Sequence, residues 1–253
     1  MHISLNKPTL DIQHISKSFG DHAVLKDISL SVQEGEIVSI LGVSGVGKTT
    51  LFNMISGLLP PDTGSVLLSG KDVTNAPGEI SYMLQKDLLL PYRTVLDNVA
   101  LPLIVKGMKK KEARAKAAPY FEEFGLEGTQ KKYPAKLSGG MRQRAALLRT
   151  YLASSGVALL DEPFSALDTI TKNAMHEWYL DVMRDIKLTT LFITHDMDEA
   201  IKLSDRICIL AGAPAQIVAE FEIKEPRPRG KDFTMTQAFI DYKRTITENL
   251  EAN

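Results

Sequence analysis

The stretch Gly42-Val43-Ser44-Gly45-Val46-Gly47-Lys48-Thr49 decides the fold of this 253-residue chain. One glycine, four residues and then Gly-Lys-Thr is the pattern of a loop that wraps phosphate groups. The segment before it, Glu36 to Leu41, is apolar and rich in β-branched residues, which predicts a buried strand. Thr50 to Ile55, which follows, contains no Gly or Pro and predicts a helix. A strand, a glycine-rich turn and a helix N-terminus together predict an α/β fold with an anion site.

The chemistry of this phosphate loop (Gly42–Thr49) suits a nucleoside triphosphate such as ATP, bound with Mg²⁺. Its glycines Gly42, Gly45 and Gly47 allow positive φ angles and close approach of the backbone. Lys48 can reach the β- and γ-phosphates, and the Thr49 hydroxyl can bind Mg²⁺. The other expected nucleotide contacts are backbone N–H groups of Val43, Ser44, Val46 and Thr50. The alternative is a glycine-rich turn that binds nothing, which the flanking strand and helix make the weaker interpretation.

Composition limits the classes of protein without naming a partner. The chain is 44% hydrophobic, and 30 basic against 31 acidic side chains leave a formal charge of -1, so no overall field recruits nucleic acid or anionic lipid. The single cysteine, Cys208, lies in an apolar run and is expected in the core. No secretion signal and no apolar run of roughly 18 residues is present, so we expect a cytosolic protein.

Two features near the phosphate loop have alternative interpretations. Residues 10 to 41 alternate short apolar segments with turns and predict an antiparallel sheet beside the nucleotide. Phe19, just before the Gly20-Asp21 turn, either stacks on a purine or simply packs. Gln85 follows a predicted strand at Ile80 to Leu84, and is either an ordinary surface residue or a contact to Mg²⁺ or water that senses the nucleotide.

The segment after Gln85 is an apolar patch in a loop. Leu88 to Arg93 either packs into the core or forms a docking surface for a partner helix. Thr94 is the expected N-cap of the next helix. A further helical pattern covers residues 109 to 124, and Pro119 is expected to break or kink it.

A second anion site is predicted at Ser138-Gly139-Gly140. Ser138 has the character of an N-cap, and the two glycines expose backbone amides at the positive end of a strong helix. The alternative is an ordinary capped helix with no ligand.

Acidic and imidazole side chains follow two further predicted strands. Val157 to Leu160 reads as a parallel strand buried on both faces, and it ends at Asp161 and Glu162. Ligands bind at the carboxyl ends of such strands, so Asp161 is expected in the Mg²⁺ shell and Glu162 as the general base for the attacking water. His195 follows a strand at Thr189 to Thr194, which favours contact with the γ-phosphate or the water over a structural role.

The C-terminal part is predicted to add one link and one helix. Pro226 to Arg229 reads as an extended link. One apolar face of a final helix is expected from Phe233, Phe239, Tyr242, Ile246 and Leu250.

Taken together, these stretches resemble the nucleotide-binding subunit of ATP-binding cassette (ABC) transporters. The resemblance covers nearly the whole chain, and the Ser-Gly-Gly signature beside a phosphate loop is its most specific part. In family order it rests on Phe19, Gly42–Thr49, Gln85, Leu137–Met141, Asp161–Glu162, Ser165–Asp168 and His195. It implies a P-loop NTPase (RecA-like) core with an antiparallel β subdomain and a helical subdomain inserted at about 86–154. The ATPase domain would span 1–230, with a helical tail at 231–253.

The resemblance also implies an assembly. Two subunits, here expected to be identical, pair head to tail, and ATP lies between one phosphate loop and the signature helix of the other. Asp168 joins the nucleotide contacts on this basis, and Phe19 is expected to stack on the purine. Transmembrane permease subunits would dock near Gln85 to Val95, on the cytoplasmic face of the membrane. An extracytoplasmic solute-binding protein would take part indirectly, and nucleic acid would not.

The pattern from Gln85 through Leu90–Val99 is similar to importers of the nitrate, sulfonate and taurine type, with relatives that import thiamine-pyrimidine precursors. Those usually carry Trp where this chain has Tyr92, and Pro119 and the turn at 211–216 also depart from the family. An exporter cassette and a soluble ABC ATPase are the rival interpretations. The latter typically needs a long coiled-coil insertion or two cassettes. A phosphate-loop GTPase would need Asn-Lys-x-Asp, which the chain lacks, and neither a GTPase nor a small kinase would use the Ser138 signature.

Overall fold

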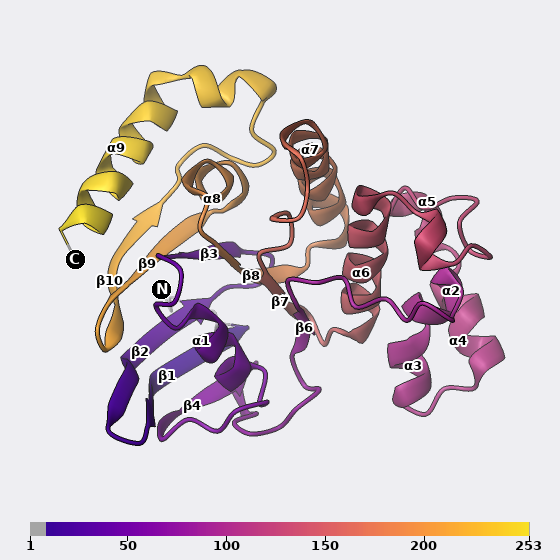
Figure 1. Ribbon diagram of the computed structural model, residues 1–253, viewed down its shortest axis with the longest axis horizontal. Helices are drawn as coiled ribbons and strands as arrows, with labels where there is room; N and C mark the ends of the chain where they lie inside the picture. Colours follow the sequence, from indigo (N-terminus) through magenta and orange to yellow (C-terminus); the bar gives the residue numbers. More distant parts are fainter. Residues whose placement is uncertain (1–8, 253) are drawn as a thin grey trace, which may run out of the picture.

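A single curled sheet of ten strands runs through the computed structural model, which describes residues 9–252 (Figure 1). The strand order is β5-β4-β1-β2-β10-β9-β3-β8-β7-β6. The strands are β1 (Leu10–Phe19), β2 (His22–Val32), β3 (Ile37–Leu41), β4 (Thr63–Leu68), β5 (Lys71–Asp72), β6 (Ser81–Met83), β7 (Val157–Asp161), β8 (Thr189–Thr194), β9 (Arg206–Gly212) and β10 (Ala215–Glu222). The helices are α1 (Lys48–Ile55), α2 (Val95–Val99), α3 (Leu101–Val105), α4 (Lys110–Ala117), α5 (Tyr120–Glu123), α6 (Gly139–Ala153), α7 (Thr169–Ile186), α8 (Met197–Leu203) and α9 (Gln237–Glu251), with 3₁₀ turns η1 (Pro134–Lys136) and η2 (Lys231–Met235).

The centre of the sheet is parallel. β9, β3, β8, β7 and β6 are neighbours in that order and all run in the same direction. Every residue of β3, β7 and β8 is buried, as expected for parallel strands covered on both faces. This confirms the α/β fold, and it brings the carboxyl ends of β3, β7 and β8 to one edge of the sheet.

An antiparallel part joins the parallel strands on one side. β1 pairs with β2 and β4, and the β1–β2 hairpin turns at Gly20-Asp21 as predicted. A Cβ added to Gly47 would lie 3.1 Å from side-chain carbons of Val24 and Leu25. β2 therefore packs directly against the phosphate loop.

The short helices α2 to α5 lie with α6 on one side of the sheet, away from the antiparallel strands (Figure 1). They share an apolar core that includes Phe121, Phe124 and Leu148. The predicted break at Pro119 is present, because α4 ends at Ala117 and α5 begins at Tyr120. We propose 86–154 as the limits of this helical subdomain.

The C-terminal segment packs back onto the core. Phe239 and Ile246 of α9 share an apolar cluster with residues of α8 and β9. The prediction placed Phe233 on the final helix, but it belongs to η2, and it contacts Phe239 edge to face with ring centroids 5.5 Å apart. The domain limits 1–230 and 231–253 remain proposals, and residues 1–8 and 253 lie outside the described part.

The link before this segment is anchored by two arginines. Arg227 binds both oxygens of Asp205 at 2.7 Å, and the Arg229 guanidinium donates to backbone carbonyls of Ile201 and Lys202. Across residues 9–252, no helix combines the length and apolar character that crossing a bilayer requires.

Candidate functional site

The phosphate loop connects β3 to α1 through a tight backbone path. Gly45 and Gly47 have φ values of 83° and 111°, as predicted. Gly42 instead allows close approach of the backbone, because a Cβ there would lie 2.5 Å from the carbonyl oxygen of Leu210. Gly47 directly precedes α1, which begins at Lys48 and so starts two residues earlier than the sequence suggested.

Lys48 is buried and its ammonium group lies over the loop. Nζ donates to the carbonyl oxygens of Gly42 at 2.7 Å and Val43 at 2.8 Å. Burial lowers the pKa of Lys48, while the charges of Glu162 and Asp161 act in the opposite direction. The cation is therefore held at the position where it can meet a bound phosphate.

Asp161, the last residue of β7, faces the start of α1. Its Oδ2 accepts hydrogen bonds from the Thr49 hydroxyl at 3.4 Å and the Tyr82 hydroxyl at 3.1 Å. Burial raises the pKa of Asp161, and the nearby charge of Glu162 adds to this. A cation bound beside Asp161 and Thr49 would offset that cost of burial.

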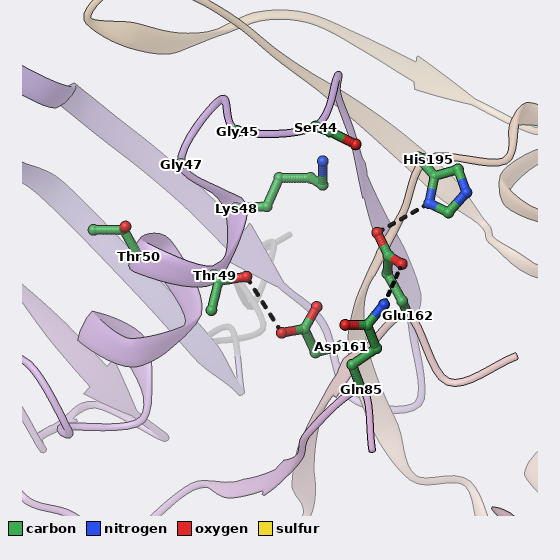
Figure 2. A pocket seen from close by; sticks show the side chains of 10 residues that line it. All are labelled: Ser44, Gly45, Gly47, Lys48, Thr49, Thr50, Gln85, Asp161, Glu162 and His195. Atoms are coloured by element: carbon green, nitrogen blue, oxygen red, sulfur yellow. Dashed lines mark hydrogen bonds and ion pairs between the residues drawn. The ribbon is translucent and has the colours of Figure 1, made fainter. Parts of the chain in front are cut away.

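Glu162 lies between two polar side chains from different parts of the chain. Gln85 Nε2 donates to Oε2 at 2.9 Å, and His195 Nδ1 lies 2.9 Å from Oε1. Figure 2 shows the Glu162 carboxylate between His195 and Gln85, opposite Lys48 and the phosphate loop. The sequence predicted Glu162 and His195 at this edge of the sheet and left Gln85 as either a surface residue or a nucleotide contact. The strand before Gln85 was predicted to run to Leu84, whereas β6 ends at Met83.

These side chains line one polar cavity of about 410 Å³ (Figure 2). Its lining comprises Ser44, Gly45, Gly47, Lys48, Thr49, Thr50, Gln85, Asp161, Glu162 and His195. Within residues 9–252, no group of three or more His, Cys, Asp and Glu is arranged to hold a metal by itself. A hydroxyl, one carboxylate and phosphate oxygens are, however, a donor set that suits Mg²⁺.

A second, wider cavity of about 840 Å³ shares Gln85, Glu162 and His195 with the first. Its other walls come from the segment after Gln85, from α6 and from the loop before α7. Arg142 of α6 binds Asp87 at 3.1 Å, and Arg149 donates to the carbonyl oxygens of Asp87 and Leu88. Gln85 therefore lies between the phosphate cavity and this second cavity.

The apolar patch after Gln85 is partly packed into the core and partly exposed, so each of the two interpretations, core packing and a docking surface, fits some of its residues. Leu89 is buried, whereas Leu88 is 52% exposed and Tyr92 is 93% exposed. Asn98 fixes the loop by bonding to the backbone of Leu90, and Thr94 caps α2 as predicted, by accepting from the Asp97 N–H at 3.2 Å. The loop is thus anchored while part of its apolar surface faces outward.

Several predicted contacts lie outside the phosphate cavity of the same chain. Ser138 caps α6 by accepting from the Met141 N–H at 3.3 Å, and Gly139 lines the second cavity. Asp168 caps α7 by accepting from the N–H of Thr171 at 3.1 Å. Ser138, Gly139, Gly140 and Asp168 are the residues that the resemblance assigned to a site between two subunits or beside it. Their contact with nucleotide stays a prediction.

Phe19 also lies outside that cavity. Its side chain is 51% exposed, and the ammonium group of Lys17 lies 5.7 Å from the ring centroid. The ring is therefore accessible to a flat ligand, and stacking on a purine stays a prediction.

Sequence reasoning missed Tyr82. It lies on β6, opposite Leu159 of β7, and its hydroxyl reaches Asp161. The only signal was an aromatic residue three positions before Gln85, which is typical of packing. Recognising its role requires knowing that β6 pairs with β7.

Comparisons with known proteins agree with this geometry. The profile of the ABC transporter family matches residues 25–165. The chain is 46% identical to the formylaminopyrimidine import ATP-binding protein ThiZ of Halalkalibacterium halodurans, over 86% of this chain and 85% of that protein. It is 35% identical to the aliphatic sulfonates import ATP-binding protein SsuB of Bacillus cereus, over 99% and 96% of the two chains.

Two further comparisons extend the match. The chain is 36% identical to the nitrate import ATP-binding protein NrtC of Synechococcus elongatus over 96% of its length, which is 38% of that longer protein. Among solved structures, a dimeric ATP-binding cassette in a post-hydrolysis state bound to ADP and Pi superposes with a TM-score of 0.71 and 29% identity. It covers 86% of this chain and all of that one.

Proposed function

We propose, for a chain that belongs to the ABC transporter family, that it is the ATP-hydrolysing subunit of an importer of a small solute. The relatives named above import a formylaminopyrimidine, aliphatic sulfonates and nitrate. A small polar or anionic solute of these types is the cargo that the likeness supports.

One observation carries this proposal. Glu162 is oriented by Gln85 and His195 at the edge of a cavity whose other side is the phosphate loop. A carboxylate held at this position can accept a proton from water that attacks the terminal phosphate. The same carboxylate borders the second cavity, so the chemistry is adjacent to a surface that can receive a partner.

Each residue of the pocket then has a defined task. The loop amides and Lys48 bind the phosphates, and the Lys48 ammonium exchanges its bonds to loop carbonyls for phosphate oxygens. Thr49, Asp161 and Gln85 would hold Mg²⁺, which neutralises phosphate charge when it is bound. Glu162 takes the proton from water, and His195 keeps the carboxylate oriented or contacts the γ-phosphate.

The assembly follows from the residues left outside the pocket. We infer that two copies pair head to tail, so that Ser138, Gly139 and Gly140 of one cover the nucleotide bound by the other. The solved relative is dimeric, which supports pairing of two copies. Membrane permease subunits would dock near Gln85 to Val95, at the cytoplasmic face of the membrane. A solute-binding protein on the other side would deliver the cargo.

The Glu162→Gln variant tests the hydrolytic role. The amide cannot accept the proton, so ATP hydrolysis is expected to fall roughly 10²- to 10⁴-fold while ATP binding persists. Because the bound ATP is not hydrolysed, a stable ATP-bound dimer of the variant should accumulate. Size-exclusion chromatography in the presence of Mg-ATP measures this dimer.

Ser138→Arg in the same background is the matched control. It should keep ATP binding by the monomer and abolish the dimer, because the long cation fills the space for the partner's nucleotide. Normal turnover in Glu162→Gln, or a dimer that survives Ser138→Arg, would contradict the assignment. An exporter is the second candidate. Co-purification with a permease and an extracytoplasmic solute-binding protein would favour import, and purification with a permease alone would favour export.

A further inference from the structure

Tyr82 is the one polar side chain of β6 that reaches the carboxylate expected to bind Mg²⁺. Its hydroxyl donates to Oδ2 of Asp161 at 3.1 Å. The Thr49 hydroxyl approaches the same oxygen at 3.4 Å. The other oxygen, Oδ1, receives neither bond, and in Figure 2 it points to the side of the cavity where Lys48 lies.

The tyrosine ring is held in place independently of this hydrogen bond. The Phe52 ring of α1 meets it edge to face, with ring centroids 5.8 Å apart. Its backbone pairs with Leu159, two residues before Asp161 on the adjacent strand. The phenol hydroxyl is a hydrogen-bond donor at neutral pH, and Asp161 Oδ2 is the acceptor that it reaches.

We propose that Tyr82 is a positioning residue that fixes the Asp161 carboxylate and presents its Oδ1 to Mg²⁺. This inference rests on the proposed function, because it assumes that nucleotide binds together with Mg²⁺. The Tyr82 hydroxyl lies closer to Oδ2, at 3.1 Å, than the Thr49 hydroxyl does at 3.4 Å, and unlike Thr49 it is not itself an expected ligand of the cation, so Tyr82 is the donor dedicated to holding Oδ2. Partners of metal ligands act in this way, and their loss typically weakens metal binding 10- to 100-fold.

The position of Tyr82 also relates Asp161 to Glu162. Gln85, three residues further along the same segment, donates to Glu162 at 2.9 Å. One short segment therefore contacts two consecutive carboxylates through two side chains: Asp161, the last residue of β7, and Glu162, which follows it. The tyrosine orients the acid that faces the cation, and the glutamine orients the acid that faces the water.

The Tyr82→Phe variant tests the inference, because it removes the hydroxyl and keeps the ring against Phe52. The measurement is binding of a slowly hydrolysed ATP analogue with a fluorescent ribose label, titrated with Mg²⁺. The Mg²⁺ concentration for half-maximal binding is expected to rise about tenfold. Binding of the same analogue in EDTA should equal that of wild type, because the phosphate loop is unchanged.

Three further variants make the outcome decisive. Tyr179→Phe removes a hydroxyl from a fully buried tyrosine of α7 and should leave the Mg²⁺ dependence unchanged. Asp161→Asn should raise the Mg²⁺ requirement more than Tyr82→Phe does. Lys48→Ala should weaken binding of the analogue with and without Mg²⁺.

The outcomes separate the inference from the function on which it rests. A wild-type Mg²⁺ dependence in Tyr82→Phe, with binding lost in Lys48→Ala, overturns the role of Tyr82 alone. Equal binding losses in EDTA and in Mg²⁺ for Tyr82→Phe would show a packing role and also overturn it. Unchanged binding in Lys48→Ala would instead contradict the nucleotide site itself.

Discussion

Glu162 has a backbone conformation that few side chains adopt. Its φ is 46°, in the left-handed region, which costs about 1–2 kcal/mol for a residue with a Cβ. Its N–H donates to the carbonyl oxygen of Ile193 at 3.0 Å, so β8 holds the turn. This turn directs the side chain of Glu162 to Gln85 and His195 and away from the line of Asp161. The strain is located at the residue proposed as general base.

The close approach of the backbone at Gly42 predicts that adding one methyl group there, in Gly42→Ala, is destabilising. In Gly42→Ala the new Cβ would meet the Leu210 carbonyl oxygen at 2.5 Å, so the loop must move away from β9. We expect a loss of about 1–3 kcal/mol in the free energy of unfolding, as for overpacked cores, and a loss of ATP binding. Chemical denaturation and nucleotide titration measure the two effects.

Gly230→Ala is the control for that experiment. A Cβ at Gly230 meets no atom within 4 Å, and its φ is -60°. Stability and ATP binding should therefore stay close to those of wild type. Equal losses in both variants would show that the Leu210 contact has no special effect.

At this scale the sequence predicted the residues whose chemistry is carried by a local motif. Lys48 and Thr49 follow the glycine turn directly, and Asp161 with Glu162 ends an apolar run, so their place in one pocket could be predicted from the sequence, while their roles stay proposals. Tyr82 could not be inferred, because its partner is 79 residues away in the chain and on the neighbouring strand. The loop geometry of Gly42 was similarly hidden, since Leu210 approaches it from β9.

Among the elements, the junction of α2 and α4 depends on one buried carboxylate. Asp97 of α2 accepts two hydrogen bonds of 2.7 Å from the guanidinium of Arg114 on α4, and Lys110 lies 3.6 Å away. Hydrogen bonds from Arg114 hold the pKa of Asp97 below its ordinary value. The carboxylate therefore contributes to stability only while it is ionised.

This sign gives a pH dependence for the junction. The stabilisation is fully present above the ordinary aspartate pKa of about 3.9, and it is lost as the pH falls through the lower pKa of the folded state. In Asp97→Asn the urea midpoint is expected to be lower than that of wild type at pH 7, and the difference should shrink below about pH 4. A difference that grows on acidification would contradict the pairing with Arg114.

The elements themselves were predicted best where a local signal ends them. Pro119 marked the break between α4 and α5, and Ser138 and Thr94 marked two helix starts by their capping side chains. The predicted end of the strand that is β6 and the prediction that Phe233 belongs to the final helix were wrong by a few residues. Both depend on tertiary packing: β6 ends where it leaves β7, and Phe233 precedes a helix that begins only after Thr236 caps it. The order of parallel strands also had no local signal.

For the whole molecule, the formal charge of -1 is the sum of a strongly basic segment and an acidic remainder. Residues 86–154 contain 14 basic and 6 acidic side chains, a formal charge of +8, so the remaining residues carry -9. In the proposed head-to-tail dimer, the signature end of each basic subdomain faces the acidic core of the partner. Opposite charges on facing surfaces favour association, and salt screens them.

This separation of charge between the basic segment and the acidic remainder predicts a dimer that weakens with salt. In the Glu162→Gln background, the dissociation constant of the ATP-bound dimer is expected to rise roughly tenfold between 0.05 and 0.5 M KCl, as screening shortens the range of these charges. Sedimentation equilibrium measures the constant. ATP binding by the monomeric Ser138→Arg variant in the same salts corrects for any effect on the nucleotide itself. A dissociation constant that stays unchanged or falls with salt would contradict the charge argument.

The position of β6 at the end of the sheet has a mechanical consequence. Three residue pairs, Ser81 to Met83 with Ala158 to Leu160, join it to its single neighbour, while every strand inside the sheet is bonded along both edges. The strand that leads into the proposed docking segment is therefore more compliant than the strands of the parallel centre. A force exerted there by a membrane partner would first displace Tyr82 and Gln85. A displacement too small to disturb the interior of the sheet could therefore still change the orientation of the Asp161 and Glu162 carboxylates.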